Sequence, residues 1–416
     1  MSTEANVAGG EVDVLAEFGT PEFRRDPYPY FRWLRENEPV CRTSAGFYLV
    51  TRHADVTFVQ NHVGDLFVSP EAAQVVELMP QVREHQLMEK LLNCLVSLNP
   101  PAHTRLRKLV ARVFTPRNIE AFRDQMAAIC ERLLDAIEEP LRDGEVVDLR
   151  KTLSRPLPML TIAGLLGVPA EEHDWLIAAA NDIFTGITAS AYGDWETVGR
   201  GDEKTVLLDE YFLRLAEQRR RQPQEDLVSG LVLSHDEDRL SDDELSSMIW
   251  LLWVAGTDTT AAGLDHCVWT LTGRPEQHEW LNAGTTEATA YVDEVLRMYS
   301  PGLFSPLPRI AIADVELGGR TIPAGSDVRV AWAAGNRDPE VFPDPDDFDP
   351  TRDTSRMLSL GGGMHHCLGK FLARAELSIA TAMLHRRFPT LTAASEPEWC
   401  GIGSDISARE VPVTLG

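Results

Sequence analysis

Apolar side chains recur every three or four residues over most of the chain, a spacing that is typical of amphipathic helices. The pattern is most regular between residues 116 and 240, where Gly167, Pro169 and Pro223 interrupt it and predict helix ends. Within this region the pattern predicts helices over residues 117–138, 155–166, 171–183 and 205–221, and a loop over residues 186–201.

The longest predicted helix begins at Ser241. Glu244 follows three residues later, which is a capping-box pattern, and the helix should run to about residue 271. Strand signals are few: residues 46–51 are rich in β-forming side chains, and residues 315–330 predict a hairpin around a Gly-Gly turn. We therefore expect a mainly α fold with a minor β-sheet region.

The chain has 416 residues, 44% of them hydrophobic, which is enough for a large core or for two domains. No linker long enough to separate two domains is present. We expect residues 1–25 to form a loose N-terminal segment, and residues 26–416 to form a single domain. Another turn is expected at residues 401–404.

The net charge of −25 disfavours nucleic acid and anionic membranes as partners of the whole surface. The longest apolar run, residues 248–255, is far too short to span a bilayer. No signal peptide is predicted, because Glu4, Glu11 and Asp13 replace the basic and apolar residues of such a segment. The six cysteines have no pairing rhythm, which fits a reducing compartment. We expect a cytoplasmic protein without a membrane or nucleic-acid partner.

A glycine-rich stretch surrounds Cys367: three glycines at 361–363 precede it, and Gly369 follows it. A cysteine at the start of a helix has its thiolate favoured by the helix dipole and the free amides. Zinc does not fit, because no second cysteine lies nearby and His365 and His366 would give awkward tetrahedral geometry. The stretch alone is equally compatible with a thiolate ligand for haem iron and with a buried structural cysteine.

Residues 255–260, inside the longest predicted helix, have the unusual sequence Ala-Gly-Thr-Asp-Thr-Thr. A glycine costs roughly 1 kcal/mol in a helix interior. The hydroxyl of Thr259 is placed to bond back to the carbonyl of Ala255 and to bend the helix. Such a widened turn beside a polar pair is suited to holding water and O₂. The alternative is a tight helix crossing that needs small residues, with a solvated aspartate.

Two further charged pairs have helical spacing. His103 and Arg107 lie four apart, on one face of a helix that opens at a pair of prolines, and together they suit a carboxylate ligand. The alternative is a solvated basic face. Glu294 and Arg297 lie three apart, and the alternative for them is a surface ion pair of little energetic weight.

These motifs, in this order, resemble those of the cytochrome P450 family from about residue 26 to the end of the chain. The haem-binding signature F-G-x-G-x-H-x-C-x-G-x-x-L-A-R-x-E is matched everywhere except at Leu360, where the family usually has Phe. Residues 255–260 match the oxygen-activation motif A-G-x-D-T-T at every position. The matched signature positions are Gly361, Gly363, His365, Cys367, Gly369, Leu372, Ala373, Arg374 and Glu376.

The resemblance implies roles for individual residues. Cys367 would be the axial ligand of haem b, held between the oxygen-activation helix and the cysteine-loop helix. Asp258 would relay protons, and Thr259 would steady the bound dioxygen. Glu294 and Arg297 would form a buried brace that Arg352 completes. The other cofactor-binding residues implied are His103, Arg107, Arg309, His365, Gly361, Gly369 and Ala255, and the implied substrate pocket contains Leu251, Ala255, Leu303 and Phe304.

The implied function is a haem-thiolate monooxygenase that inserts one oxygen atom from O₂ into a largely apolar small molecule. Similar soluble actinobacterial members act on secondary metabolites such as polyketides and macrolides. A ferredoxin-type electron donor with its reductase would supply electrons, and Arg105, Lys108, Arg112 and Lys370 would form a basic island for it. The alternatives are a haem-thiolate enzyme of oxidative cyclisation or C–C coupling, and a non-enzymatic haem-binding protein.

Overall fold

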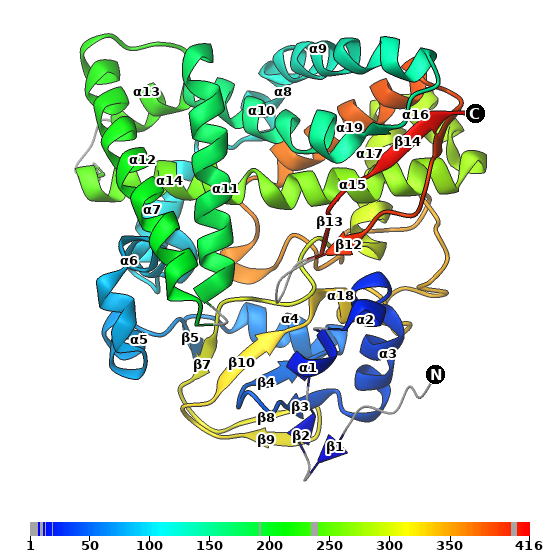
Figure 1. Ribbon diagram of the computed structural model, residues 1–416. Helices are drawn as coiled ribbons and strands as arrows, with labels where there is room; N and C mark the ends of the chain where they lie inside the picture. The colour runs from blue at the N-terminus through cyan, green and yellow to red at the C-terminus, as the bar shows by residue number, and fades with distance from the viewer. Residues whose placement is uncertain are drawn as a thin grey trace.

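The computed structural model describes residues 7–8, 11–12, 14–18, 20–190, 193–233, 240–400 and 406–416. Helices dominate these residues, and Figure 1 shows most of the helices above a smaller region that is rich in strands. The predicted mainly α fold with a minor β-sheet region is therefore confirmed.

The helices follow one another closely along the chain. They are α1 Val14–Phe18, α2 Pro21–Arg25, α3 Tyr28–Asn37, α4 His53–Asn61, α5 Ala72–Leu78, α6 Gln86–Asn93, α7 Ala102–Ala111, α8 Pro116–Ala121, α9 Arg123–Arg142, α10 Pro156–Leu166, α11 His173–Ser190, α12 Trp195–Arg221, α13 Leu227–Val232, α14 Asp242–Ala255, α15 Asp258–Gly273, α16 Glu279–Ala283, α17 Thr285–Met298, α18 Trp332–Gly335 and α19 Lys370–Arg387. A π-helical turn, η3, covers Arg150–Ser154.

The strands are short. They are β1 Val7–Ala8, β2 Glu11–Val12, β3 Val40–Arg42, β4 Tyr48–Val50, β5 Phe67–Val68, β6 Val147–Asp148, β7 Arg309–Ala311, β8 Val315–Leu317, β9 Arg320–Ile322, β10 Asp327–Val330, β11 Leu391–Ala393, β12 Trp399–Cys400, β13 Ser407–Ala408 and β14 Pro412–Leu415.

The largest sheet brings distant parts of the chain together. Its strand order is β3-β4-β10-β7-β5, and only the pair β4 and β10 is parallel, with Val328 opposite Tyr48. The predicted strand at residues 46–51 is β4, and the predicted hairpin is formed by β8 and β9. Because β7 begins at Arg309, the sheet carries this side chain next to segments from the first quarter of the chain.

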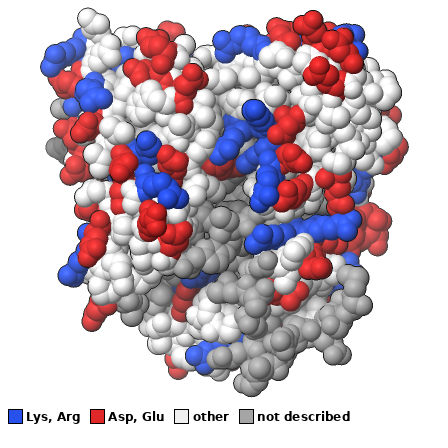
Figure 2. Space-filling model, in the orientation of Figure 1, with Lys and Arg blue, Asp and Glu red and all other residues white. Residues whose placement is uncertain are grey.

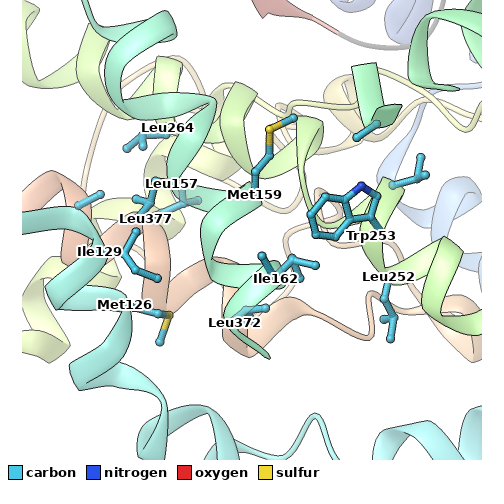
Figure 3. Packing of buried hydrophobic residues seen from close by; sticks show 14 of the residues in the cluster. Met126, Ile129, Leu157, Met159, Ile162, Leu252, Trp253, Leu264, Leu372 and Leu377 are labelled. Carbon is cyan, nitrogen blue, oxygen red and sulfur yellow. The ribbon is translucent and has the colours of Figure 1, made fainter. Parts of the chain in front are cut away.

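The main hydrophobic core lies among the helices. Figure 3 shows side chains from α9, α10, α14, α15 and α19 packing against one another. A Cβ atom added to Gly263 of α15 would lie 3.2 Å from Leu377 Cδ1 of α19, so these two helices are in close contact there. The labelled residues of this packing are Met126, Ile129, Leu157, Met159, Ile162, Leu252, Trp253, Leu264, Leu372 and Leu377.

The longest predicted helix is present but interrupted. Ser241 and Glu244 form the predicted capping box at the start of α14, and the helix breaks between Ala255 and Asp258. A Cβ atom on Gly256 would come within 2.9 Å of Ile162 Cδ1, so the glycine allows α10 to approach the break. The stretch is thus a bent helix and also a close helix contact, but Asp258 is buried, so the solvated aspartate of the second alternative was wrong.

The loop predicted over residues 186–201 was wrong. Helix α11 continues to Ser190 and α12 begins at Trp195, where the side chain of Asp194 caps it. The glycines that favoured a loop allow a close helix contact, because a Cβ atom on Gly186 would lie 3.5 Å from Gly201 Cα. Glycine is a weak guide to loops wherever two helices approach closely.

The expectation of a loose N-terminal segment differs from the structure where that segment is described. Helices α1 and α2 pack into a second core, in which Val14, Phe18 and Phe23 are buried. The Phe18 ring lies 4.5 Å from that of Phe23 and 5.1 Å from that of Phe304, measured between centroids. The turn expected at residues 401–404 lies outside the described residues.

Candidate active site

Cys367 lies in the loop that leads into α19. Its backbone N–H donates to the carbonyl of Leu360 over 2.8 Å, which closes the loop around the side chain. Gly361 and Gly363 have φ of +68° and +59°, a conformation that favours glycine. A Cβ atom on Gly363 would lie 2.0 Å from the carbonyl oxygen of Gln60, so no other residue fits there.

The loop does not itself favour a thiolate. Burial raises the pKa of Cys367, while the Gly369 N–H, Arg107 and Lys370 oppose this increase only in part. The expectation that the helix start would favour the thiolate is therefore corrected, because desolvation outweighs the helix amides. A metal ion bound to the sulfur would deprotonate it outright.

Four basic side chains converge beside this loop, and we call them the basic cluster: His103 and Arg107 from α7, Arg309 from β7, and His365. The rings of His103 and His365 lie 4.4 Å apart between centroids. Arg309 Nη1 donates to Ser69 Oγ over 3.0 Å, and Arg107 donates to the carbonyl of His366. The partners of the two arginines are carbonyls and one hydroxyl, and none of the four side chains pairs with a carboxylate among the described residues.

The basic cluster lacks partners that its burial would ordinarily require. Both ring nitrogens of His103 and Nε2 of His365 are buried without a hydrogen-bond partner among the described residues. Burial lowers the pKa of His103 to about 4 and that of His365 to about 3, and the neighbouring arginines contribute. Burial also lowers the pKa of Arg309 to about 10. These groups would be satisfied by an anionic ligand.

One face of the interrupted helix stays accessible, although Figure 1 shows α15 running through the middle of the molecule. Ala255 and Thr259 are exposed, whereas Val254, Asp258 and Thr260 are buried. The hydrogen bond between the two exposed residues places them side by side across the break, and we call their common side the inner face. Thr259 Oγ1 donates to the Ala255 carbonyl over 2.9 Å, as predicted.

Asp258 points the other way, into a charged interior. Burial raises the pKa of its carboxyl, and Arg155 and Arg150 oppose this increase. Its Oδ1 lies 3.8 Å from Arg150 Nη2, and its Oδ2 has no hydrogen-bond partner among the described residues. A buried carboxyl with a raised pKa is suited to holding and passing a proton.

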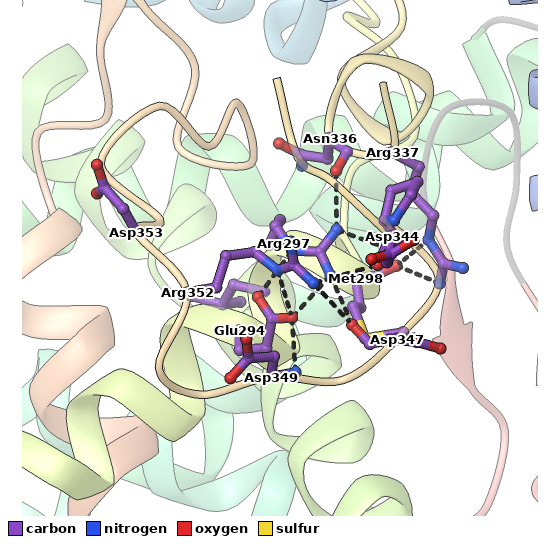
Figure 4. A network of polar contacts seen from close by, with 12 residues as sticks. Glu294, Arg297, Met298, Asn336, Arg337, Asp344, Asp347, Asp349, Arg352 and Asp353 are labelled. Carbon is purple, nitrogen blue, oxygen red and sulfur yellow. Dashed lines mark hydrogen bonds and ion pairs between the residues drawn. The ribbon is translucent and has the colours of Figure 1, made fainter. Parts of the chain in front are cut away.

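Glu294 and Arg297 form a fully buried ion pair rather than a surface one. Arg297 Nε donates to Glu294 Oε2 and Arg297 Nη2 to Glu294 Oε1, each over 2.7 Å. Arg352 Nε donates to the same carboxylate over 3.2 Å, so the structure brings the three side chains of the expected brace together, as Figure 4 shows.

This brace is connected to the cysteine loop through Asn336. Arg297 Nη1 donates to the Asn336 carbonyl over 3.0 Å. The Asn336 side chain in turn accepts from the Leu358 N–H and donates to Ser359 Oγ, each over 2.6 Å. The loop bearing Cys367 starts at these two residues, so the buried charges hold one end of it in place.

Comparisons with known proteins agree with this arrangement. Residues 287–407 match the family model described as Cytochrome P450. The chain is 40% identical over 397 residues to Cytochrome P450 BJ-3 of Bradyrhizobium diazoefficiens, covering 92% of each protein. The chain belongs to the cytochrome P450 family.

Other P450 enzymes are also similar to this chain over almost its whole length. Nocardicin C N-oxygenase of Nocardia uniformis is 37% identical, over 95% of this chain and 97% of the relative. The solved structure of PksS, the P450 of the bacillaene polyketide synthase of Bacillus subtilis 168, has a TM-score of 0.83 and 29% identity. It covers 96% of this chain and 99% of that protein. This chain is therefore a P450 monooxygenase, which uses O₂ and a redox partner on small substrates.

The residues present fit the haem group that the P450 family implies. In the basic cluster, both ring nitrogens of His103 and Nε2 of His365 lack partners and could meet the haem carboxylates, and His365 lies two residues from Cys367. A Cβ atom on Gly369 would meet nothing within 4 Å, so the start of α19 also leaves space. A haem with iron ligated by a cysteine thiolate would satisfy both the sulfur and the basic cluster.

Leu303 and Phe304 do not line an open pocket, contrary to the expectation from the resemblance. Both are almost fully buried in the second core, and Phe304 stacks on Phe47 with ring centroids 6.4 Å apart. Pro306 is exposed and Leu307 is half-buried, close before Arg309, and the sequence analysis did not single out either residue. The prolines at 301, 306 and 308 are the sequence feature that could have drawn attention to this loop.

Leu251 was also expected in the pocket. It lies four residues before Ala255 on the inner face and is 8% exposed. Arg150, which faces Asp258, was missed because nothing in the sequence marks a contact between elements so far apart. In the described part of the chain, no helix is both long and apolar enough to cross a bilayer.

We predict that Arg297→Ala lowers the free energy of unfolding by about 3–5 kcal/mol, because it leaves the buried Glu294 carboxylate without its main partner. The purified variant should contain little haem, since the cysteine loop loses its anchor. Denaturant unfolding and the haem-to-protein ratio measure both effects.

Arg409→Ala is the matched control. Arg409 pairs with Glu398, but their side chains are 68% and 55% exposed, so its loss should cost less than about 1 kcal/mol. Normal haem content and stability in Arg297→Ala would contradict the role assigned to the brace.

Proposed function

We propose that this P450 holds haem b through Cys367 and oxidises a largely apolar, polyketide-like small molecule. The observation that carries the proposal is that one cysteine lies next to a basic cluster without a carboxylate partner among the described residues. Haem is a cofactor that offers both a metal for the sulfur and carboxylates for the cluster. His103, Arg107, Arg309 and His365 would bind the propionates.

When bound, a thiolate-ligated haem supplies the activation of O₂. The residues of this chain would supply the proton. Asp258, whose pKa is raised by burial, would hold the proton. The hydroxyl of Thr259 already donates to the Ala255 carbonyl, so its oxygen keeps its lone pairs free to accept a proton or a hydrogen bond.

The substrate class rests on two lines of support. Leu251 and Ala255 make the inner face apolar, and Pro306 and Leu307 would add apolar surface beside Arg309. PksS, which is similar in fold and sequence, is named as the P450 of a polyketide synthase. We propose that the substrate is an apolar polyketide or macrolide-like biosynthetic intermediate that receives one oxygen atom from O₂.

We further propose a ferredoxin-type electron donor with its reductase. The face drawn in Figure 2 carries acidic and basic side chains intermixed. Because the net charge of the chain is −25, a surface region with only basic side chains would differ in charge from most of the surface. Lys108 and Arg112 are exposed at the end of α7 and fit this role. Arg105 is less suitable because it pairs with Glu244, and Lys370 Nζ lies 3.4 Å from His366 Nδ1.

The ligand assignment predicts the spectrum of the reduced protein under carbon monoxide. The wild type should show the strongly red-shifted Soret band of a thiolate ligand, and Cys367→His should move the band to the position typical of histidine ligation. Cys400→Ser, at another partly exposed cysteine, is the control and should keep the wild-type spectrum. A thiolate band that persists in Cys367→His would refute the assignment.

The substrate assignment predicts that apolar macrolactones shift the Soret band on binding, and that turnover under ¹⁸O₂ places one labelled oxygen atom in the product. Ala255→Phe should fill the inner face and weaken binding by about tenfold or more, since it removes the space for an apolar ligand. Ala170→Phe, at an exposed alanine, should bind as the wild type does. Unchanged binding in Ala255→Phe would exclude the inner face as the substrate site.

The donor assignment predicts that Lys108→Glu combined with Arg112→Glu slows reduction by ferredoxin about tenfold or more at low ionic strength. The dependence of this rate on salt should flatten, because the attraction that salt screens has been removed. Arg132→Glu, at an exposed arginine of α9, should have little effect. Unchanged rates and salt dependence in the double variant would end the docking proposal.

A further inference from the structure

Two aspartates of α15 share one arginine. Asp258 and Asp265 lie seven residues apart, and both face Arg150 of η3. Arg150 Nη1 lies 2.7 Å from Asp265 Oδ2, which is a charge-assisted hydrogen bond. The distance from Arg150 Nη2 to Asp258 Oδ1 is 3.8 Å, too long for a hydrogen bond. The cation is therefore shared unequally, and Asp265 has the larger share.

The remaining partners maintain this inequality. Asp265 Oδ2 also accepts the Ala408 N–H over 3.3 Å, which fixes it from the C-terminal side. Arg155 has the larger opposing effect on the Asp258 pKa, but its hydrogen bond goes to the side chain of Asn181, so it is not the cation that the two aspartates share. His266 adds no positive charge at neutral pH, because burial lowers its pKa to about 3.

We propose that Asp265 and Arg150 are positioning residues that keep Asp258 loosely ion-paired, so that its carboxyl can release and regain a proton. This inference rests on the proposed role of Asp258 as the proton donor. Neither Arg150 nor Asp265 lies on the inner face, so both would act through Asp258 alone.

The physical reason is competition for one guanidinium. A full salt bridge would hold Asp258 ionised, since an opposite charge in contact lowers a carboxyl pKa. Asp265 prevents this by holding Arg150 in a shorter bond. Burial raises the pKa of Asp265 itself to about 6, so this competition operates above that pH, where Asp265 is ionised. Removing the charge of Asp265 should let Arg150 move towards Asp258 and lower the Asp258 pKa. Removing the charge of Arg150 should raise that pKa, because burial then acts with less opposition.

The two changes should therefore shift the pH profile in opposite directions. Asp258 must be protonated to donate, so O₂-driven turnover falls as the pH rises through its pKa. In Asp265→Asn this fall should move to lower pH, and in Arg150→Gln it should move to higher pH. A purely structural defect would lower the turnover rate in both variants but would not shift their pH profiles in opposite directions.

The direct test is an infrared pH titration of the haem-loaded protein. The band of the protonated Asp258 carboxyl is identified by its loss in Asp258→Asn. We expect its midpoint to fall by about one pH unit in Asp265→Asn and to rise in Arg150→Gln. Asp226→Asn is the matched control, since it also removes a buried carboxylate from an arginine pair and should leave the midpoint unchanged.

A double variant keeps the test valid if Arg150→Gln folds poorly through its unpaired buried Asp265. Arg150→Gln combined with Asp265→Asn removes both charges, and the downward shift of Asp265→Asn should then disappear, because it depends on Arg150. No shift in Asp265→Asn, or a downward shift that persists in the double variant, would overturn the inference. Coupled turnover in Asp258→Asn would instead overturn the proposed role of Asp258 and leave the titration result standing.

Discussion

The guanidinium of Arg297 is fully buried, and the architecture around it is organised to satisfy its N–H groups. A buried cation without acceptors would cost more than the surrounding packing could recover. Glu294 supplies the countercharge, and the carbonyls of Asn336, Pro345 and Asp347 accept the remaining bonds. Three carbonyls of the segment that follows α18, residues 336–347, thus bond to this one side chain. Through Asn336 the same constraint reaches Leu358 and Ser359, where the cysteine loop begins.

A contrast between satisfied and unsatisfied charge locates the active site. Around Arg297 every charge has a partner within the chain. Around His103 and Arg309 the donors converge and the carboxylates are missing, although burial makes this unfavourable. Proteins rarely leave buried polar atoms unpaired without a reason, and the reason proposed here is the pair of carboxylates of the haem group that the P450 family implies.

The interrupted helix combines three functions in one short segment. Gly256 lets α10 approach, Thr259 bends the backbone, and Asp258 turns away from the inner face towards Arg150. The hydroxyl and the carboxyl are adjacent in sequence but point into different environments, one accessible and one buried. Such a division is possible because successive helical residues point about 100° apart.

Local pattern was sufficient to predict helices, the capping box at Ser241, the bend at Thr259 and the contact between Glu294 and Arg297. Each depends on residues within one or two turns of the same helix, so spacing alone specifies their geometry. The motif around Cys367 likewise restricts its own backbone, since only glycine adopts the required φ next to Gln60.

Tertiary packing decided the rest. The glycines at 186 and 201 became a helix contact rather than a loop, Phe304 turned into the N-terminal core, and residues 14–18 and 20–25 joined that core. The pKa of Cys367 rose instead of falling because burial, which spacing does not reveal, outweighed the helix start. The sharing of Arg150 between Asp258 and Asp265 joins elements that meet only in the folded chain. Side-chain burial and long-range pairing are properties of the assembled core, whereas helix periodicity and glycine geometry are properties of the chain.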